Sequence, residues 1–180
     1  PEEGYELVAG HRRHHACELA GMETMPVIVR EMDDDVATIL MVDSNLQRET
    51  LLPSERALAY KMKLEALKHQ GMRTDLTSTQ VAQKLSVQQV GDDAGVSKDT
   101  VRRFIRLTEL IPELLDMVDQ KQIAFSPAVE LSFLNVEEQK QLLEAMDYAQ
   151  ATPSLSQAQR LKKYSQEGKC TLEVMCTVMD

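Results

Sequence analysis

The stretch Ser86–Leu110 constrains the fold of this chain more than any other segment. Apolar residues recur at helical spacing over 87–94, and Gly91 in that run is small enough for two crossing helices to touch there. Gly95 then supplies a turn, and Ser97 is a good N-cap for a second helix that begins at residue 98. Two short helices joined by a turn in this order predict a helix-turn-helix over 86–110.

The second of these helices has an apolar side and a basic side. A helical projection puts on the apolar side Val101, Phe104, Ile105 and Thr108. The opposite side carries Lys98, Asp99, Arg102, Arg103 and Arg106. Most isolated basic helices are solvated faces, but a small-residue helix and a turn precede this one, as in helices that enter the major groove of DNA. We therefore expect double-stranded DNA to contact Ser97, Lys98, Thr100, Arg102, Arg103 and Arg106.

The charge of the chain is distributed unevenly. The 180 residues carry a net charge of −9, which is unusual for a protein that binds nucleic acid. Residues 1–52 hold 11 acidic and 4 basic side chains, whereas residues 97–107 hold four basic side chains and only one acidic one. Salt screens charges beyond about 8–10 Å. We therefore expect DNA contact to be confined to the basic helix and to be sensitive to salt.

Composition also bears on compartment. The three cysteines, Cys17, Cys170 and Cys176, are too few and too scattered for a disulfide framework, so we expect reduced thiols in a cytoplasmic protein. No apolar run approaches the roughly 18–20 residues that span a bilayer, and no signal peptide is recognisable. We expect no membrane association, and we expect the sequence to be a piece of a longer protein.

The pattern of elements predicts an α+β fold. Residues 1–52 are expected to form a small mixed α/β domain, with strands at 5–9 and 26–29 and helices at 12–19 and from Asp33 to Met41. Residues 53–165 are expected to form an all-α DNA-binding domain that contains the helix-turn-helix. Its other helices are expected to start at Pro53, Thr77, Pro112, Ser126, Val136 and Ser154. Residues 166–180 stay unassigned.

Two polar motifs lie in the first 52 residues. Gly10-His11-Arg12-Arg13 is placed where a predicted strand meets a helix, and the backbone N–H groups of a first helical turn are ready donors to an anion. Residues 44–49, Ser-Asn-Leu-Gln-Arg-Glu, separate two apolar helical segments. From the residues alone this second motif either recognises a nucleotide or caps a helix.

These motifs, in this order, resemble the ParB family of chromosome and plasmid partition proteins. The sequence GHRRHHA at 10–16 resembles the family's GERR box, and SNLQRE at 44–49 resembles its Glu-Asn-x-Gln-Arg box. LLPSERALAY at 51–60 resembles the helix that follows, and 86–110 resembles the family's helix-turn-helix. The resemblance covers nearly the whole chain, and proteins of this kind on integrative and conjugative elements look most similar.

The resemblance implies a dimeric clamp on DNA. In this family the helix-turn-helix recognises a palindromic centromere-like site, the N-terminal domain binds CTP with Mg²⁺ and closes against its partner, and a ParA-type ATPase is engaged. By position, Gly10, Arg12 and Arg13 would hold the triphosphate. The nucleotide site would be completed by Asn45, Gln47 and Arg48. Such a protein would be associated with the nucleoid or a plasmid.

Two positions depart from the family's pattern. His11 stands where the first box has glutamate, and Ser44 stands where the second box has the glutamate associated with the magnesium–triphosphate end. Asp43 is adjacent, but one step along a helix turns a side chain by about 100°, and a hard cation prefers carboxylate oxygen. We therefore expect CTP hydrolysis to be weak at most, and we assign no catalytic residue.

The residues give less support to a metal site and to two alternative functions. His11, His14 and His15 lie on one predicted helix, but no carboxylate or cysteine pattern completes a metal site and two arginines adjoin them. One alternative function is a helix-turn-helix transcriptional regulator without nucleotide switching. Another is a nuclease, but Asp33–Asp35 is better explained as a helix start than as a metal cluster.

Overall fold

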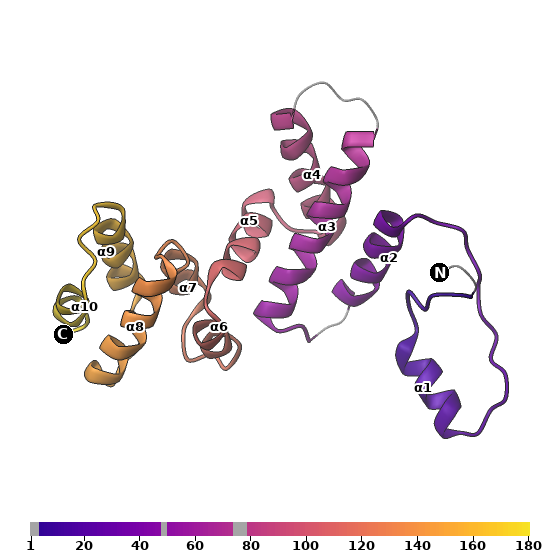
Figure 1. Cartoon of the computed structure of the whole chain (residues 1–180), viewed down its shortest axis with the longest axis horizontal. Coiled ribbons are helices and arrows are strands. Elements are labelled where there is room, and N and C mark those ends of the chain that lie inside the picture. Colours follow the sequence, from indigo (N-terminus) through magenta and orange to yellow (C-terminus); the bar gives the residue numbers. More distant parts are fainter. Residues whose placement is uncertain (1–3, 48–49, 74–78) are drawn as a thin grey trace.

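In a computed structural model the chain forms a row of short helices (Figure 1). The structure describes residues 4–47, 50–73 and 79–180. Its helices are α1 (His11–Leu19), α2 (Asp34–Leu46), α3 (Pro53–Arg73), α4 (Thr79–Ala94), α5 (Lys98–Arg106), η1 (Leu107–Glu109), α6 (Pro112–Asp119), α7 (Phe125–Leu131), α8 (Val136–Ala149), α9 (Leu155–Gln166) and α10 (Leu172–Met179). No helix among these residues is both long enough and apolar enough to cross a bilayer.

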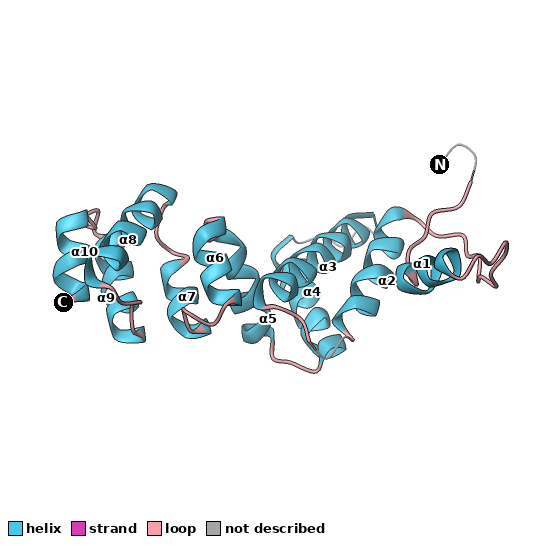
Figure 2. Cartoon of the chain, turned by 90° about the horizontal axis from the view of Figure 1, so that it is seen from below, coloured by secondary structure: helices cyan, strands magenta, loops and turns pink. Residues whose placement is uncertain are grey.

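The helices are arranged along one long axis. Figures 1 and 2 show α1 and α2 at the N-terminal end, α3, α4 and α5 in the middle, and α6 to α10 at the C-terminal end. Helix α5 packs against both α3 and α4 and also contacts α7. The predicted recognition helix therefore lies in the middle of the molecule, next to the C-terminal group of helices.

The predicted mixed α/β domain is wrong, because residues 4–47, 50–73 and 79–180 contain helices and loops but no strand. The segments 5–9 and 26–29 are irregular, and side chains such as Tyr5 (85% exposed) and Ile28 (84% exposed) face solvent. β-Branched residues favour a strand only when a second strand pairs with the backbone and a core covers one face. The sequence shows residue types that favour strands. It does not show that the described residues contain no second strand to pair with them.

Two hydrophobic cores hold the helices together. The first core is built from Tyr60, Leu64, Val87, Val90 and Val101. The second core is larger and lies mainly among α6 to α10, with fully buried side chains such as Leu114, Leu131, Leu142, Leu161 and Met175. Phe104 on α5 packs against both cores. Helix α10 belongs to the second core, so residues 166–180 continue the same fold.

Most predicted helix starts in the described residues are confirmed, and side-chain caps mark several of the helix starts in the structure. The side chains that accept a hydrogen bond from the backbone of the following turn are Asp33, Asn135, Ser154 and Thr171. Asn135 and Ser154 form complete capping boxes with Glu138 and Gln157. These signals are local, so they are readable from sequence. The predicted start at Thr77 lies outside the described residues.

The start of α3 is anchored to the end of α6. The Ser54 N–H donates to Asp119 Oδ1 at 3.0 Å, and the Ser54 hydroxyl donates to Asp119 Oδ2. A carboxylate at a helix N-terminus satisfies free N–H groups and complements the helix dipole. This contact joins residues 65 positions apart and sets the position of α3 relative to the second core.

Gln139 on α8 is a buried hydrogen-bonding hub. Its side chain is 1% exposed. Its amide donates to the carbonyl oxygens of Glu109 at 3.1 Å and Leu134 at 2.9 Å, and its oxygen accepts from the Ile111 N–H at 2.8 Å. One side chain therefore satisfies three backbone groups at the points where α6 and α8 begin.

We predict that Gln139→Leu lowers the free energy of unfolding by about 2–4 kcal/mol, because it leaves these buried backbone groups without partners. Urea denaturation monitored by circular dichroism measures the change. Gln159→Leu, at an exposed position of α9, is the matched control and is expected to change stability by less than about 0.5 kcal/mol. Equal effects of the two substitutions would show that the network does not stabilise the fold.

Candidate nucleic-acid interface and nucleotide motifs

The turn between α4 and α5 is a Schellman motif. Gly95 has a φ of +66°, a backbone conformation that glycine adopts without steric cost. Its N–H donates to the Asp92 carbonyl at 3.2 Å, and the Val96 N–H donates to the Gly91 carbonyl at 2.9 Å. Both bonds satisfy carbonyl groups at the end of α4. They fix the direction in which the chain leaves α4.

Gly91 allows the close approach predicted from sequence. A Cβ atom at this position would lie 2.7 Å from the Val96 carbonyl oxygen and 3.3 Å from the Lys98 backbone nitrogen. Both neighbours are backbone atoms, so neither moves without displacing the turn. At Gly91 the last turn of α4 therefore lies close to the backbone that leads into α5.

Helix α5 begins and buries its apolar side as predicted. Ser97 has extended backbone angles, and its Oγ accepts from the Thr100 N–H at 3.1 Å. Val101 is fully buried, and Phe104, Ile105 and Thr108 are half-buried. Together with α4 and the turn, this geometry confirms the helix-turn-helix over 86–110.

The N-terminal half of α5 presents its polar side to solvent. Lys98, Asp99, Arg102 and Arg103 are all exposed. Arg102 Nη1 lies 3.2 Å from Asp99 Oδ1, a surface ion pair of the kind that contributes little to stability and exchanges readily for another partner. Lys98 and Arg102 therefore remain accessible to a polyanion.

The two later arginines of α5 are engaged with the segment around α7. Arg103 Nη2 donates to Ser126 Oγ at 2.8 Å, and its guanidinium lies 5.0 Å from the centre of the Phe125 ring. Arg106 is half-buried. Its Nη2 donates to the Ser132 carbonyl at 2.7 Å. The basic side of α5 thus divides into an exposed half and a half that holds α7.

Phe133 extends this contact to α9. Its ring lies 4.2 Å from the Arg106 guanidinium and 3.6 Å from Lys162 Nζ, while Lys162 also pairs with Glu130 at 2.8 Å. Cation–π contacts of this kind contribute about 0.5–2 kcal/mol each. Sequence reasoning missed Ser126, Phe133 and Lys162, because they lie 20 or more residues from α5 and no local pattern marks them.

The first polar motif occupies the start of α1. Gly10 has a φ of +93° and precedes the helix, and no side chain caps the first turn. Arg12 and Arg13 are exposed. Arg13 folds back so that its Nη2 lies 3.5 Å from the place where a Cβ on Gly10 would stand. The motif therefore combines first-turn N–H groups that have no side-chain cap with two accessible guanidinium groups, and these donors suit phosphate oxygens.

The second polar motif begins on the last turn of α2. Ser44 and Gln47 are exposed and Asn45 is half-buried, while Arg48 lies outside the described residues. In Figure 1 the helix α1 lies apart from α2. No hydrogen bond or ion pair joins the described residues of the first motif to those of the second. The structure therefore positions each motif but does not bring the two together.

Asp43, next to Ser44, is engaged in a buried ion pair. Lys63 on α3 is 1% exposed, and its Nζ lies 2.6 Å from Asp43 Oδ1 and 2.8 Å from Asp93 Oδ2 on α4. Burial alone lowers the pKa of Lys63, but its hydrogen bonds to both carboxylates outweigh burial and leave that pKa above the ordinary value. Lys63 is therefore charged at neutral pH and joins α2, α3 and α4.

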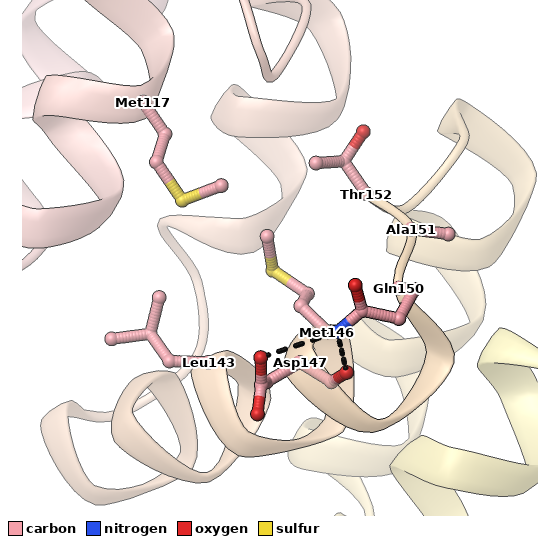
Figure 3. Close-up of a pocket in the computed structure, with 7 residues that line it drawn as sticks. All are labelled: Met117, Leu143, Met146, Asp147, Gln150, Ala151 and Thr152. Atoms are coloured by element: carbon pink, nitrogen blue, oxygen red, sulfur yellow. Dashed lines mark hydrogen bonds between the residues drawn. The ribbon is translucent and has the colours of Figure 1, made fainter.

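In the part of the chain that the structure describes, neither a metal cluster nor the groove beside α8 adds to the predicted sites. Among the described residues, no group of three His, Cys, Asp or Glu side chains is arranged to hold a metal ion. A shallow groove runs between α6 and α8 (Figure 3) and is lined by Met117, Leu143, Met146, Asp147, Gln150, Ala151 and Thr152. None of the predicted DNA- or nucleotide-binding residues lines this groove.

Comparison with known protein families agrees with the geometry. The family model described as "ParB HTH domain" matches residues 49–167. The chain belongs to the ParB family. A second model, "ParB N-terminal domain", matches residues 1–46, so the boundary between the two ParB domains falls between α2 and α3. The resemblance inferred from the sequence motifs is confirmed.

Matches to individual ParB relatives cover most of the chain. The "Chromosome-partitioning protein Spo0J" of Thermus thermophilus is 34% identical over 146 residues, which is 79% of this chain and 48% of the relative. The "Probable chromosome-partitioning protein ParB" of Vibrio cholerae is 30% identical over 152 residues, which is 84% of this chain and 46% of the relative. The chain thus spans about half the length of the curated relatives it matches.

A solved structure shares the fold. It is described as the crystal structure of the C-terminally truncated chromosome-partitioning protein ParB from Caulobacter crescentus complexed to the centromeric parS site. The TM-score is 0.50 at 25% sequence identity, covering 87% of this chain and 73% of the other.

We predict that Gly91→Ala lowers the free energy of unfolding by about 1–3 kcal/mol, because the added Cβ collides with the Val96 carbonyl. The direction of the change in stability is informative, because in an unconstrained helix alanine is more favourable than glycine by about 1 kcal/mol. Thermal and urea denaturation measure the change. Gln89→Ala, at an exposed site of α4, is the control. A gain in stability for Gly91→Ala would show that the turn does not press on α4.

Proposed function

We propose that this chain is the DNA-binding part of a ParB-type partition protein, which recognises a double-stranded, palindromic, centromere-like site. The observation that carries the proposal is the exposed basic edge of α5, with Lys98 and Arg102 accessible to a polyanion. The capped start of α5 and the Schellman turn before it hold this edge in place. The relative solved with its centromeric parS site supports the same use of the shared fold.

The DNA contacts are assigned by position along α5. Lys98 and Arg102 are exposed at the N-terminal half of the helix, the half that reaches base edges in helix-turn-helix proteins. Thr100 and Ser97 lie at the start of the helix, where the helix dipole favours a phosphate. Arg103 is also assigned to DNA, because its contact with Ser126 can be replaced by a contact with phosphate. A palindromic site implies that two copies bind it as a dimer.

Arg106 is assigned a different role from the one its position in the sequence suggests. Its bond to the Ser132 carbonyl and its stacking on Phe133 use the guanidinium to hold α5 against the α7 segment. We therefore place Arg106 among the residues that orient the recognition helix, not among those that read DNA.

The N-terminal motifs are assigned to CTP. The donors at Gly10, Arg12 and Arg13 fit a triphosphate, and Asn45 and Gln47 supply amides suited to a base or sugar. The part of the site that would hold Mg²⁺ is expected to bind the ion weakly. Ser44 offers only a hydroxyl there, and the neighbouring Asp43 carboxylate is already bound to Lys63. Binding without efficient hydrolysis is therefore the expected chemistry. A ParA-type ATPase partner and residence on a mobile element belong to the same proposal.

One observation favours a second candidate. Ser44 stands at the Mg²⁺ end, the neighbouring Asp43 is bound to Lys63, and the described residues 44–47 of the second motif carry no carboxylate. A protein that occupies its DNA site without nucleotide switching, as a transcriptional regulator does, is compatible with this arrangement.

We predict that Arg102→Ala reduces the preference for a parS duplex over a scrambled duplex by about 1–3 kcal/mol, as expected when a side chain reads a base edge. Fluorescence anisotropy with labelled duplexes at several salt concentrations measures both affinities. Lys169→Ala, which removes the same charge between α9 and α10, is the control. If the variant binds both duplexes more weakly by the same factor, Arg102 contacts only phosphate. If the unmodified chain shows no preference, the proposal fails.

We predict selective binding of CTP with Mg²⁺, measured by isothermal titration calorimetry against ATP, GTP and UTP. Arg13→Ala is expected to weaken it on the order of tenfold or more, because a charge-assisted bond to phosphate is lost. Arg30→Ala, in the loop between α1 and α2, removes the same charge as a control. Absence of CTP binding with DNA recognition intact would favour the regulator.

A further inference from the structure

The buried Lys63 ion pair crosses the boundary between the two ParB domains. Asp43 belongs to the N-terminal match, which ends at residue 46, whereas Lys63 and Asp93 belong to the helix-turn-helix match, which begins at 49. The Nζ of Lys63 contacts both carboxylates at hydrogen-bonding distance. One ammonium group therefore links the two domains through the interior of the molecule.

Each end of this link adjoins a proposed functional element. Asp43 directly precedes Ser44 and Asn45 of the second polar motif. Asp93 lies between Gly91, where α4 touches the start of α5, and Gly95, whose left-handed backbone directs the chain into α5. Lys63 therefore connects Asp43, beside the second motif, with the end of α4 that sets the direction of α5.

We propose that Lys63 is a positioning residue for DNA recognition, coupling the placement of α2 and its polar motif to the orientation of α5. The inference rests on the proposed DNA-binding function. Apolar contact alone does not define this link, since Leu46 packs against the first core without a directional bond. The two hydrogen bonds of Lys63 do have a direction, so they distinguish one placement of α2 from another.

The Asp43→Asn substitution tests the proposal, because charge and coupling predict opposite changes in DNA affinity. Removing an acidic side chain makes the protein less negative and, acting through charge alone, strengthens binding to DNA. Coupling through Lys63 predicts the opposite, a weakening of parS binding by about 2- to 30-fold. Asp92→Asn is the matched control: it removes the same charge next to Asp93, and Asp92 contacts Gln88, not Lys63. The control is expected to bind DNA as tightly as the unmodified chain, or slightly more tightly.

The variants are chosen to remain folded. After Asp43→Asn, Lys63 still pairs with Asp93. After Lys63→Met, which keeps most of the side-chain volume, both carboxylates remain about 40–46% exposed to water, so no isolated charge is buried. Asp43→Glu restores the carboxylate and is expected to recover affinity relative to Asp43→Asn. Thermal denaturation confirms that each variant is folded at the temperature of the binding assay.

A double-mutant cycle and hydrogen–deuterium exchange complete the test. In the Lys63→Met background, Asp43→Asn is expected to cause no further weakening of DNA affinity. Exchange is expected to accelerate over residues 87–97 in Asp43→Asn but not in Asp92→Asn, because the end of α4, although still paired with Lys63, loses its connection to α2. The proposal is overturned if the Asp43→Asn variant binds DNA as tightly as the Asp92→Asn variant. It is also overturned if Asp43→Asn changes DNA affinity equally with and without Lys63. If the unmodified chain binds no DNA, the proposed function fails, and exchange still decides whether Asp43 is coupled to α4.

Discussion

The position of the recognition helix depends on the ring of Phe104, which lies between the two hydrophobic cores. Its ring centre is 5.7 Å from that of Tyr60 on α3, in an edge-to-face arrangement, and 4.6 Å from that of Phe125 on α7. Aromatic pairs in such geometries add about 0.5–1.5 kcal/mol each to the burial of their surface. Because Phe104 points inward from α5, the side of the helix that bears Lys98 and Arg102 faces outward.

Basic side chains have two distinct uses in this protein. Lys98 and Arg102 stay exposed, whereas Lys63, Arg106 and Lys162 join helices that are distant in sequence. Cations in the second group are paired with carboxylates, a carbonyl or an aromatic face, as buried charge requires. A helical projection therefore does not show which basic residues also contact other helices, since Arg106 lies on the polar side of α5 but is bound to the α7 segment.

Sequence reasoning succeeded where the signal is local and failed where it depends on a partner. Ser97, Asp33 and Ser154 mark helix starts because a cap and the N–H it accepts from lie within three residues. The strands expected at 5–9 and 26–29 required pairing with backbone elsewhere, and no described segment supplies it. Likewise, nothing in the sequence around α5 indicates that Arg103 meets Ser126, or that Lys63 reaches both Asp43 and Asp93.

The sequence by itself determined the helix-turn-helix, its capped second helix, the two polar motifs and hence the ParB family, because these depend on residue types at short fixed spacings. Only the tertiary structure decided which charges remain accessible. Packing brought Arg106 onto Phe133, buried Lys63 between two carboxylates and engaged Asp43 beside the second motif. The physical reason is that desolvating a charge requires a partner, and the partners here lie 20 or more residues away in sequence, at distances that only the folded chain defines.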